Sequence, residues 1–407
     1  MNIKKSNFRN LIIIFLLVCI FIFLSATLPA KAPKIPETVQ NITEFESYLL
    51  QLTRKGPVPG ISMVVVKNDS IVYNKGFGWA DEPKHMSAST KTVYHWFSVT
   101  KIITAVAILQ LAEQNKLQLN DAVVKYLPFF KVKYPSDSSK PITIINLLNH
   151  SSGLPDPGLH MFRWVHYDEN SAINQTELVK KVIPELSKLE FEPGTDTKYT
   201  NFGYMVLGAI IEKVTGQNYE DYIRQNILKP LAMNHTDFVY TKDMEPFEAA
   251  GTHPVFDPMT LAIPYVKGRI IREVSKKYFW LNRFYNDQTP PTALIGSAED
   301  AARFVIAYLN NGELDSTHIL TQQSVKKMTC DNYMKKASYK YSYYVRQGLG
   351  WQIYKDKHGL MLQHSGGGLG FSTIIQLYPE EKLGFILFSN DTYCKGWKIV
   401  KLASDLD

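Results

Sequence analysis

The chain has 407 residues, of which 45% are hydrophobic and 20% are charged. This composition is that of a globular protein with a sizeable core, and the absence of low-complexity segments and fixed-period repeats argues against solenoids and propellers. The formal net charge is +7, but four of the basic residues lie in positions 1–32, which contain no acid. The remainder is only weakly basic, so the composition gives no indication of a nucleic-acid partner.

The cysteines and histidines indicate no metal centre. Cys19 lies in an apolar N-terminal run, which leaves Cys330 and Cys394, and the sequence does not decide whether these two pair. The ten histidines are scattered, and no Cys/His spacing matches a zinc site. We therefore expect neither a metal nor an organic cofactor.

The N-terminus, residues 1–32, has the pattern of an export signal. Three basic residues precede an uninterrupted apolar run at 11–24, and Ala30-Lys31-Ala32 fits a small-x-small cleavage site. The alternative is an uncleaved membrane anchor, because 11–30 carries no charge and is just long enough to span a bilayer. Pro33 also counts against cleavage directly before it. Either way, the body of the protein is expected outside the cytoplasm, in the periplasm or cell envelope or secreted.

From position 33 the chain has the pattern of a folded domain. Residues 33–44 form a linker, and a first helix is expected over 38–54. The run "GISMVVVKNDSIVYNKGFG" contains two β-rich stretches around Asn-Asp-Ser, which predicts a hairpin of strands 61–67 and 70–77. The following "YHWFSVTKIITAVAILQL" is apolar almost all round from residue 97 onward, as is typical of a helix buried on every side.

Helices separated by long polar loops follow over about 120–291. Two are clear, at 174–189 and 203–215, and a later one begins with the capping box Ser297/Asp300 and ends at Asn311-Gly312. After a Lys/Tyr-rich segment at 333–346 come four strand-like runs and a closing helix. These are expected at 348–354, 359–364, 371–377, 383–389 and 395–407.

Strands at both ends with helices between them predict an α+β fold. We expect an antiparallel sheet built from the N- and C-terminal segments and flanked by helices, with a mainly helical lobe inserted at about 120–291. The domain would cover residues 45–394, and a cleft is expected between its lobes.

A serine and a lysine stand one helical turn apart in the apolar helix. Residues i and i+3 share a helix face, so Ser98 and Lys101 can touch. A buried amine has a lowered pKa and can accept the proton of a serine hydroxyl, and the nearby helix N-terminus favours negative charge. The same Ser-x-x-Lys pattern recurs at Ser324/Lys327, but in a polar segment that predicts a solvated helix face.

Two further motifs fit the same chemistry. Tyr199 and Asn201 lie in a loop just before a helix, where a phenol near a lysine can act as general base and an amide can hold substrate. A predicted strand runs through His364-Ser365-Gly366 into a glycine cluster, which would let a substrate backbone bind along the strand. The N–H groups of Ser98 and Gly367 could then form an oxyanion hole. The structural alternatives are a packed tyrosine and a wide turn.

In this order, the three motifs resemble those of the serine β-lactamase and penicillin-binding-protein superfamily: class C β-lactamases, D-alanyl-D-alanine carboxypeptidases and related esterases. The pattern S-x-x-K corresponds to Ser98/Lys101, Y-x-N to Tyr199/Asn201 and [KH]-[ST]-G to 364–366. Three longer stretches are also similar to the family, and the resemblance covers about residues 45–390. These stretches are "ITIINLLNHSSGLP", "EPGTDTKYTNFGYMVLGAIIEKVTG" and "GSAEDAARF".

The resemblance implies a serine hydrolase that works through an acyl-enzyme on Ser98. Lys101 and Tyr199 would move protons, while Asn201 and the strand at 364–367 would hold a peptide, amide or ester. The protein is expected to act as a monomer on a small-molecule substrate. It would touch a membrane only through an uncleaved N-terminus.

The third motif departs from most true β-lactamases, which have lysine where this chain has His364. An imidazole with its ordinary pKa of about 6.5 would be partly charged at neutral pH, which predicts weak and pH-dependent recognition of a substrate carboxylate. β-Lactam hydrolysis is therefore an alternative to peptide or ester cleavage. A penicillin-binding sensor that is acylated but does not turn over is the other alternative.

Overall fold

The structure, a computed structural model, describes residues 33–169, 174–255, 270–275, 278–329 and 344–406. The expected export signal at 1–32, Cys330 and most of the Lys/Tyr-rich segment therefore lie outside the described residues. Across the described ranges, no helix has both the length and the apolar composition needed to cross a membrane.

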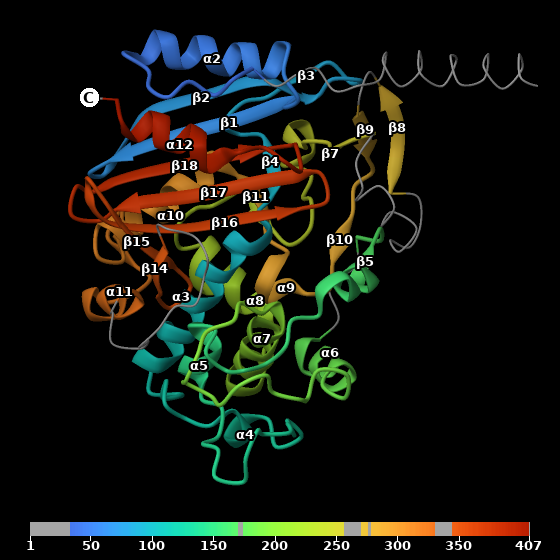
Figure 1. Ribbon diagram of the computed structural model, residues 1–407, viewed down its shortest axis with the longest axis vertical. Coiled ribbons are helices and arrows are strands. Elements are labelled where there is room, and N and C mark those ends of the chain that lie inside the picture. The colour runs from blue at the N-terminus through green and yellow to red at the C-terminus, as the bar shows by residue number, and fades with distance from the viewer. Residues whose placement is uncertain (1–32, 170–173, 256–269, 276–277, 330–343, 407) are drawn as a thin grey trace, which may run out of the picture.

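An eight-stranded sheet joins the two ends of the chain, as the sequence predicts (Figure 1). N-terminal strand β1 pairs antiparallel with C-terminal strand β18, with Ile61 opposite Ser389. The seven pairings in the sheet are antiparallel. In spatial order the strands are β14 (Tyr344–Gln347), β15 (Gln352–Asp356), β16 (Gly359–Gly368), β17 (Phe371–Tyr378), β18 (Leu383–Ser389), β1 (Gly60–Lys67), β2 (Ser70–Asp81) and β3 (Met86–Ser87).

Helices cover both faces of this sheet, which explains why β1 reads as a nearly continuous apolar run rather than an alternating one. Helices α2 (Ile42–Arg54) and α12 (Gly396–Ser404) pack on one face around Ile61 and Phe385. Helix α10 (Ala298–Leu309) covers the other face, and the Ser297 hydroxyl accepts the Asp300 N–H at 3.0 Å. The expected N-cap is confirmed, but the second half of the predicted capping box is not formed: the Asp300 carboxylate accepts the His235 N–H and the Thr236 hydroxyl, and the Ser297 N–H donates to His235 O.

The inserted lobe is mainly helical, as predicted, and lies below the sheet in Figure 1. Its α-helices, with the flanking α11, are α3 (Thr100–Glu113), α4 (Val123–Tyr126), α5 (Ile144–Leu148), α6 (Gln175–Val182), α7 (Asn201–Thr215), α8 (Tyr219–Ile223), α9 (Thr289–Thr292) and α11 (Gln322–Met328). Tighter or wider turns form η1 (Phe97–Val99), η2 (Gly158–Trp164), η3 (Arg224–Leu228) and η4 (Glu245–Phe247).

Short strands outside the main sheet form small sheets of two or three strands. The small sheets are β4 (Val93–His95) with β11 (Ile295–Ser297) and β6 (Thr236–Asp237), β7 (Thr252–Pro254) with β9 (Tyr278–Leu281) and β8 (Ile271–Ser275), β10 (Tyr285–Asn286) with β5 (Val165–His166), and β12 (Glu313–Leu314) with β13 (Thr317–His318).

Several predicted boundaries are wrong, and three of them have a clear local reason. The first helix begins at Ile42 rather than 38, because the Asn41 side chain caps it by accepting the Glu44 N–H. Helix α6 ends at Val182 instead of 189, since Pro184 has no N–H with which to continue the helical hydrogen bonds. Only the second half of the strand expected at 348–354 is present, in β15, because residues 348–351, with Gly350 at φ +80°, form the turn that separates it from β14.

The segment after β18 fastens the sheet to the lobe. The Asn390 amide donates to the backbone oxygens of Trp79, Ala80 and Ala250. The adjacent Asp391 carboxyl is 1% exposed, and burial raises its pKa to about 7, although the backbone N–H groups of Tyr393 and Cys394 act in the opposite direction.

Because the folded state holds a proton on Asp391 more tightly than the unfolded state, this residue stabilises the fold at low pH. That contribution is lost as the pH rises through 7. We expect the free energy of unfolding to fall by about 2–3 kcal/mol between pH 5 and 8, and Asp391→Asn to remove that fall. Urea denaturation at both pH values measures it, with exposed Asp137→Asn as the control. If the free energy of unfolding of Asp391→Asn fell between pH 5 and 8 as much as that of the wild type, the assignment would be contradicted.

Candidate active site

Ser98 stands at the start of the helical segment that opens the lobe. The chain leaves β4, makes the single turn η1 and continues into α3, so Ser98 lies at a helix N-terminus with its side chain partly exposed. Phe97 has φ +46°, a left-handed conformation that is uncommon for a bulky residue and that clusters at functional sites. The Thr373 hydroxyl holds the turn by donating to Trp96 O at 2.8 Å.

Lys101 is fully buried and reaches three chain segments at once. Its Nζ lies 3.2 Å from Ser98 Oγ, 2.8 Å from Asn201 Oδ1 and 3.0 Å from Pro291 O. Burial lowers the Lys101 pKa well below its ordinary value, although the Asp156 carboxylate acts in the opposite direction. The predicted contact between the serine and the lysine is therefore present, and the amine is one that loses its proton easily.

Tyr199 and Asn201 meet the lysine from the start of α7. The Thr200 hydroxyl caps this helix by accepting the Phe202 N–H, which fixes the residues on either side of it. The Lys101 Nζ lies 4.8 Å from the centre of the Tyr199 ring. The backbone and amide N–H groups of Asn201 both donate to Asp156 Oδ2, at 2.7 and 3.2 Å, which turns its Oδ1 toward the lysine.

His150 is a site residue that the sequence analysis did not single out. Its ring centre lies 4.4 Å from that of Tyr199, its Nδ1 accepts the Thr200 N–H at 3.3 Å, and its carbonyl accepts the Lys198 N–H at 3.0 Å. Burial, Lys101 and His364 lower the His150 pKa well below its ordinary value, so the ring stays neutral and Nδ1 remains an acceptor. The only sequence signal was its place in a stretch similar to the family.

Strand β16 carries the third motif past the serine. Its neighbour β15 pairs with it only as far as Gln363, so within the described chain the segment 364–368 has a paired strand, β17, on one side only. Gly366 passes so close to η1 that an added Cβ would overlap Trp96 O and lie 3.0 Å from Ser98 N. The glycines are thus part of a continuous strand with an open edge and not a wide turn.

Along β16 the side chains alternate between the interior and solvent. His364 and Gly366 are buried, whereas Ser365 and Gly367 are exposed. The His364 ring is 3% exposed and its centre lies 6.3 Å from that of Tyr199. Burial and the neighbouring Lys101 lower its pKa to about 3. The expectation of a partly charged imidazole at neutral pH is therefore wrong, because a buried site next to an amine disfavours a second cation.

The second Ser-x-x-Lys pattern takes no part in this cluster. Ser324 lies in α11 and bonds with its N-cap Thr321, and it is 3% exposed, so the expected solvated face is wrong for the serine itself. Among the described residues, no group of three or more His, Cys, Asp or Glu side chains could hold a metal ion.

The chain is similar to known proteins over most of its length. The beta-lactamase family profile matches residues 45–398. Protein flp of Staphylococcus aureus (strain MW2) is 33% identical over 344 residues, which are 83% of this chain and 60% of that protein. The chain therefore spans about 60% of the length of this curated relative.

Solved structures share the fold. The octameric penicillin-binding protein homologue from Pyrococcus abyssi superposes with a TM-score of 0.70 and 28% identity, over 90% of this chain and 77% of that one. EstCE1, a hydrolase with promiscuous acyltransferase activity, superposes with a TM-score of 0.70 over 89% of this chain and 97% of that one. At 20% identity, this second likeness concerns the fold alone.

The lowered pKa of His364 has a direct spectroscopic consequence. We expect its imidazole NMR signals, assigned by comparison with His364→Gln, to stay at the positions of the neutral ring from pH 5 to pH 8. The same signals in the urea-unfolded chain should titrate near pH 6.5. A folded-state midpoint near 6.5 would show that the ring is solvated and not buried.

Proposed function

This chain belongs to the beta-lactamase family, and from that premise we propose that it is an exported serine hydrolase that forms an acyl-enzyme on Ser98. The observation that carries the proposal is the fully buried Lys101, whose Nζ contacts Ser98 Oγ and Asn201 Oδ1. A buried amine with a lowered pKa beside a partly exposed hydroxyl is the arrangement that activates a serine nucleophile. Export rests on the pattern of residues 1–32.

The hydrogen bonds around Lys101 explain how it takes the proton. A neutral amine has two N–H bonds, which Asn201 Oδ1 and Pro291 O accept, and one lone pair, which then faces Ser98 Oγ. The serine proton moves to Nζ as Oγ bonds to the substrate carbonyl carbon. Lys101 then returns the proton, directly or through the Tyr199 hydroxyl, to the leaving nitrogen or oxygen, and water hydrolyses the acyl-enzyme.

The open edge of β16 supplies the binding surface for the acyl group. Its segment 364–368 has room for an added backbone strand, and the N–H groups of Ser98 and Gly367 are proposed to bind the oxyanion. Asn201 is proposed to hold the substrate through the amide N–H that does not donate to Asp156. The lysine that holds a carboxylate in most β-lactamases is replaced by His364, whose burial keeps it neutral. Uncharged peptide, amide or ester groups are therefore favoured near the scissile bond.

The second candidate is a penicillin-binding protein that is acylated without turnover. It is favoured by the similarity to the Pyrococcus abyssi protein, a penicillin-binding protein homologue. Intact mass recorded over time after addition of a p-nitrophenyl ester or a fluorescent penicillin separates the two. A transient adduct supports the hydrolase, a permanent one supports the sensor, and no adduct overturns both.

We expect Ser98→Ala to abolish labelling by a fluorophosphonate while leaving the melting temperature nearly unchanged, because only one hydroxyl is removed. Ser324→Ala is the matched control, since it alters the other Ser-x-x-Lys pattern, and should label like the wild type. Peptide mapping of the adduct checks the result. A label on any serine other than Ser98 would contradict the assignment.

The acylation rate should rise with pH through a midpoint well below about 10.4, the ordinary lysine value, because only the neutral Lys101 amine accepts the serine proton. Lys101→Met keeps the side-chain volume and should lower the rate by several powers of ten. Stopped-flow labelling across pH measures both. Near-normal turnover in the Met variant would show that the lysine is structural.

A further inference from the structure

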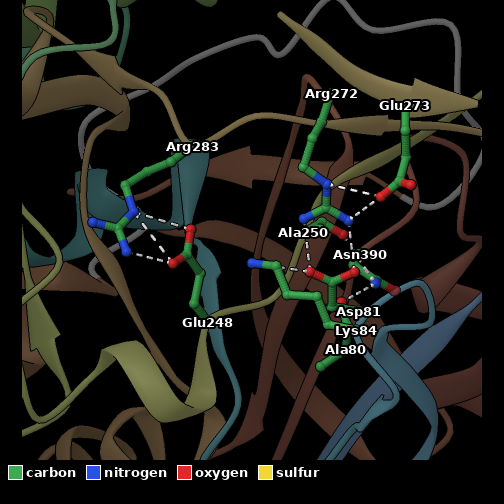
Figure 2. A network of polar contacts seen from close by, with 9 residues as sticks. All are labelled: Ala80, Asp81, Lys84, Glu248, Ala250, Arg272, Glu273, Arg283 and Asn390. Atoms are coloured by element: carbon green, nitrogen blue, oxygen red, sulfur yellow. Dashed lines mark hydrogen bonds and ion pairs between the residues drawn. The ribbon is translucent and has the colours of Figure 1, made fainter.

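A cavity of about 210 Å³ lies beyond the serine on the side of the β16–β17 turn. Its apolar part is formed by Leu281, Phe284 and Phe371. Its polar part is formed by two ion pairs and a lysine, which Figure 2 shows on facing sides: Arg283 with Glu248, and Arg272 with Asp81 and Lys84. None of these residues belongs to the cluster around Lys101.

Phe97 separates this cavity from the serine. Its ring lies against Gly368, the last residue of β16, where an added Cβ would overlap it. On its other side the ring centre lies 5.7 Å from that of the cavity residue His95. Gly368 is two residues beyond Gly366, which packs on Ser98 N, so this end of the strand is about 7 Å from the serine along β16. An acyl chain lying along the strand would therefore lead toward the cavity.

The guanidinium groups of the two arginines donate most of their N–H groups to carboxylates of the protein. Arg272 Nη1 and Nη2 bond both oxygens of Asp81 at 2.7 Å, and Asp81 is 1% exposed. Arg283 bonds Glu248 through Nε and Nη2. Three further carboxylates contact these arginines, but each is at least 44% exposed and none lines the cavity, so solvent screens them: Glu169, Glu245 and Glu273.

Lys84 is the cationic side chain in the cavity lining that can pair with a ligand. Its Nζ is 3.5 Å from Asp81 Oδ2, a looser contact than the two that Arg272 makes to the same carboxylate. Its side chain is 59% exposed, so it can reorient at little cost. The ionised side chains that line the cavity carry one more positive than negative charge, and that excess corresponds to Lys84.

His95 adds a buried polar group to the lining of the cavity. It is 2% exposed, and its ring stacks on Phe284 with centres 4.3 Å apart. Within the described chain its nitrogens make no hydrogen bond, although a neutral imidazole has one donor and one acceptor to satisfy. The stacked rings can pack against the methylene groups of a ligand, and the imidazole can hydrogen-bond a polar group at its end.

We infer that this cavity is a specificity subsite that binds a carboxylate on the acyl side of the substrate, separated from the scissile carbonyl by an apolar spacer longer than the roughly 7 Å from the serine to the end of β16. This inference specifies the acyl group that the proposed hydrolase would accept, and it rests on that proposed function. The carboxylate would bond Lys84, with the His95 N–H as the second donor, while the spacer packs on Phe284 and Phe371. Asp81 keeps its two bonds to Arg272 and therefore stays neutralised when Lys84 turns to the ligand.

The test uses mono-p-nitrophenyl esters of linear dicarboxylic acids of increasing length, each compared with its methyl-capped ester. For chains that span the distance, we expect the wild type to prefer the free acid by about three- to tenfold in kcat/KM. Lys84→Met should abolish that preference and leave the rate on the capped esters unchanged. Exposed Lys91→Met, which removes the same charge away from the cavity, should keep the preference.

A binding measurement separates failure of the subsite from failure of the proposed function. Calorimetry measures how tightly Ser98→Ala, which cannot turn over, binds each mono-p-nitrophenyl ester with a free carboxylate and its methyl-capped counterpart. We expect tighter binding of the free acid, and loss of this difference when Lys84→Met is added. Preference in binding without hydrolysis by the wild type would overturn the hydrolase and keep the subsite. Equal values for acid and capped ester, or an equal loss in the Lys84 and Lys91 variants, would overturn the subsite.

Discussion

The structure around the site depends on the burial of one amine. A lysine with no exposed surface is strongly destabilising unless its hydrogen-bonding groups find partners. Lys101 finds them on three segments that are far apart in the chain: its own helix, the start of α7 and Pro291 in α9. Satisfying this amine therefore fixes how α3, α7 and α9 pack against one another. The same requirement places an amide beside a hydroxyl, which is the pairing that the proposed chemistry needs.

Burial also sets the charge of the other groups. It pushes Lys101, His150 and His364 toward their neutral forms, and each of the two histidines is further disfavoured as a cation by Lys101. Neutral groups keep their lone pairs, so His150 can accept the Thr200 N–H and hold the Tyr199 loop. In the cavity beyond Phe97 the titratable groups stay ionised instead, because its arginines are paired with carboxylates. Phe97 thus separates a site of suppressed charge from one of paired charge.

Close backbone packing is the second constraint. The turn that presents Ser98 is wedged against β16, and glycine at 366 is needed because a side chain there would overlap Trp96 O. At the other end of this region, Thr392 Oγ1 accepts the Gly370 N–H, and Asn390 ties the end of β18 to Ala250. The position of the open strand edge relative to the serine is therefore set by contacts among the sheet, the β16–β17 turn and the lobe, and not by β16 alone.

The sequence by itself determined the elements whose signals are local. Hydrophobic periodicity and caps predicted the sheet strands from both ends, the buried helix and the Ser297 cap, and helical spacing predicted that Ser98 and Lys101 touch. Only the tertiary structure decided the contacts and the charges that depend on segments far apart in the sequence. His150 and Asp156 hold the Tyr199–Asn201 segment across about 50 residues, a separation that no periodicity reports. The charge of His364 was predicted wrongly for the same reason, because a pKa follows from burial and from neighbours that the fold assembles, and not from the residue type.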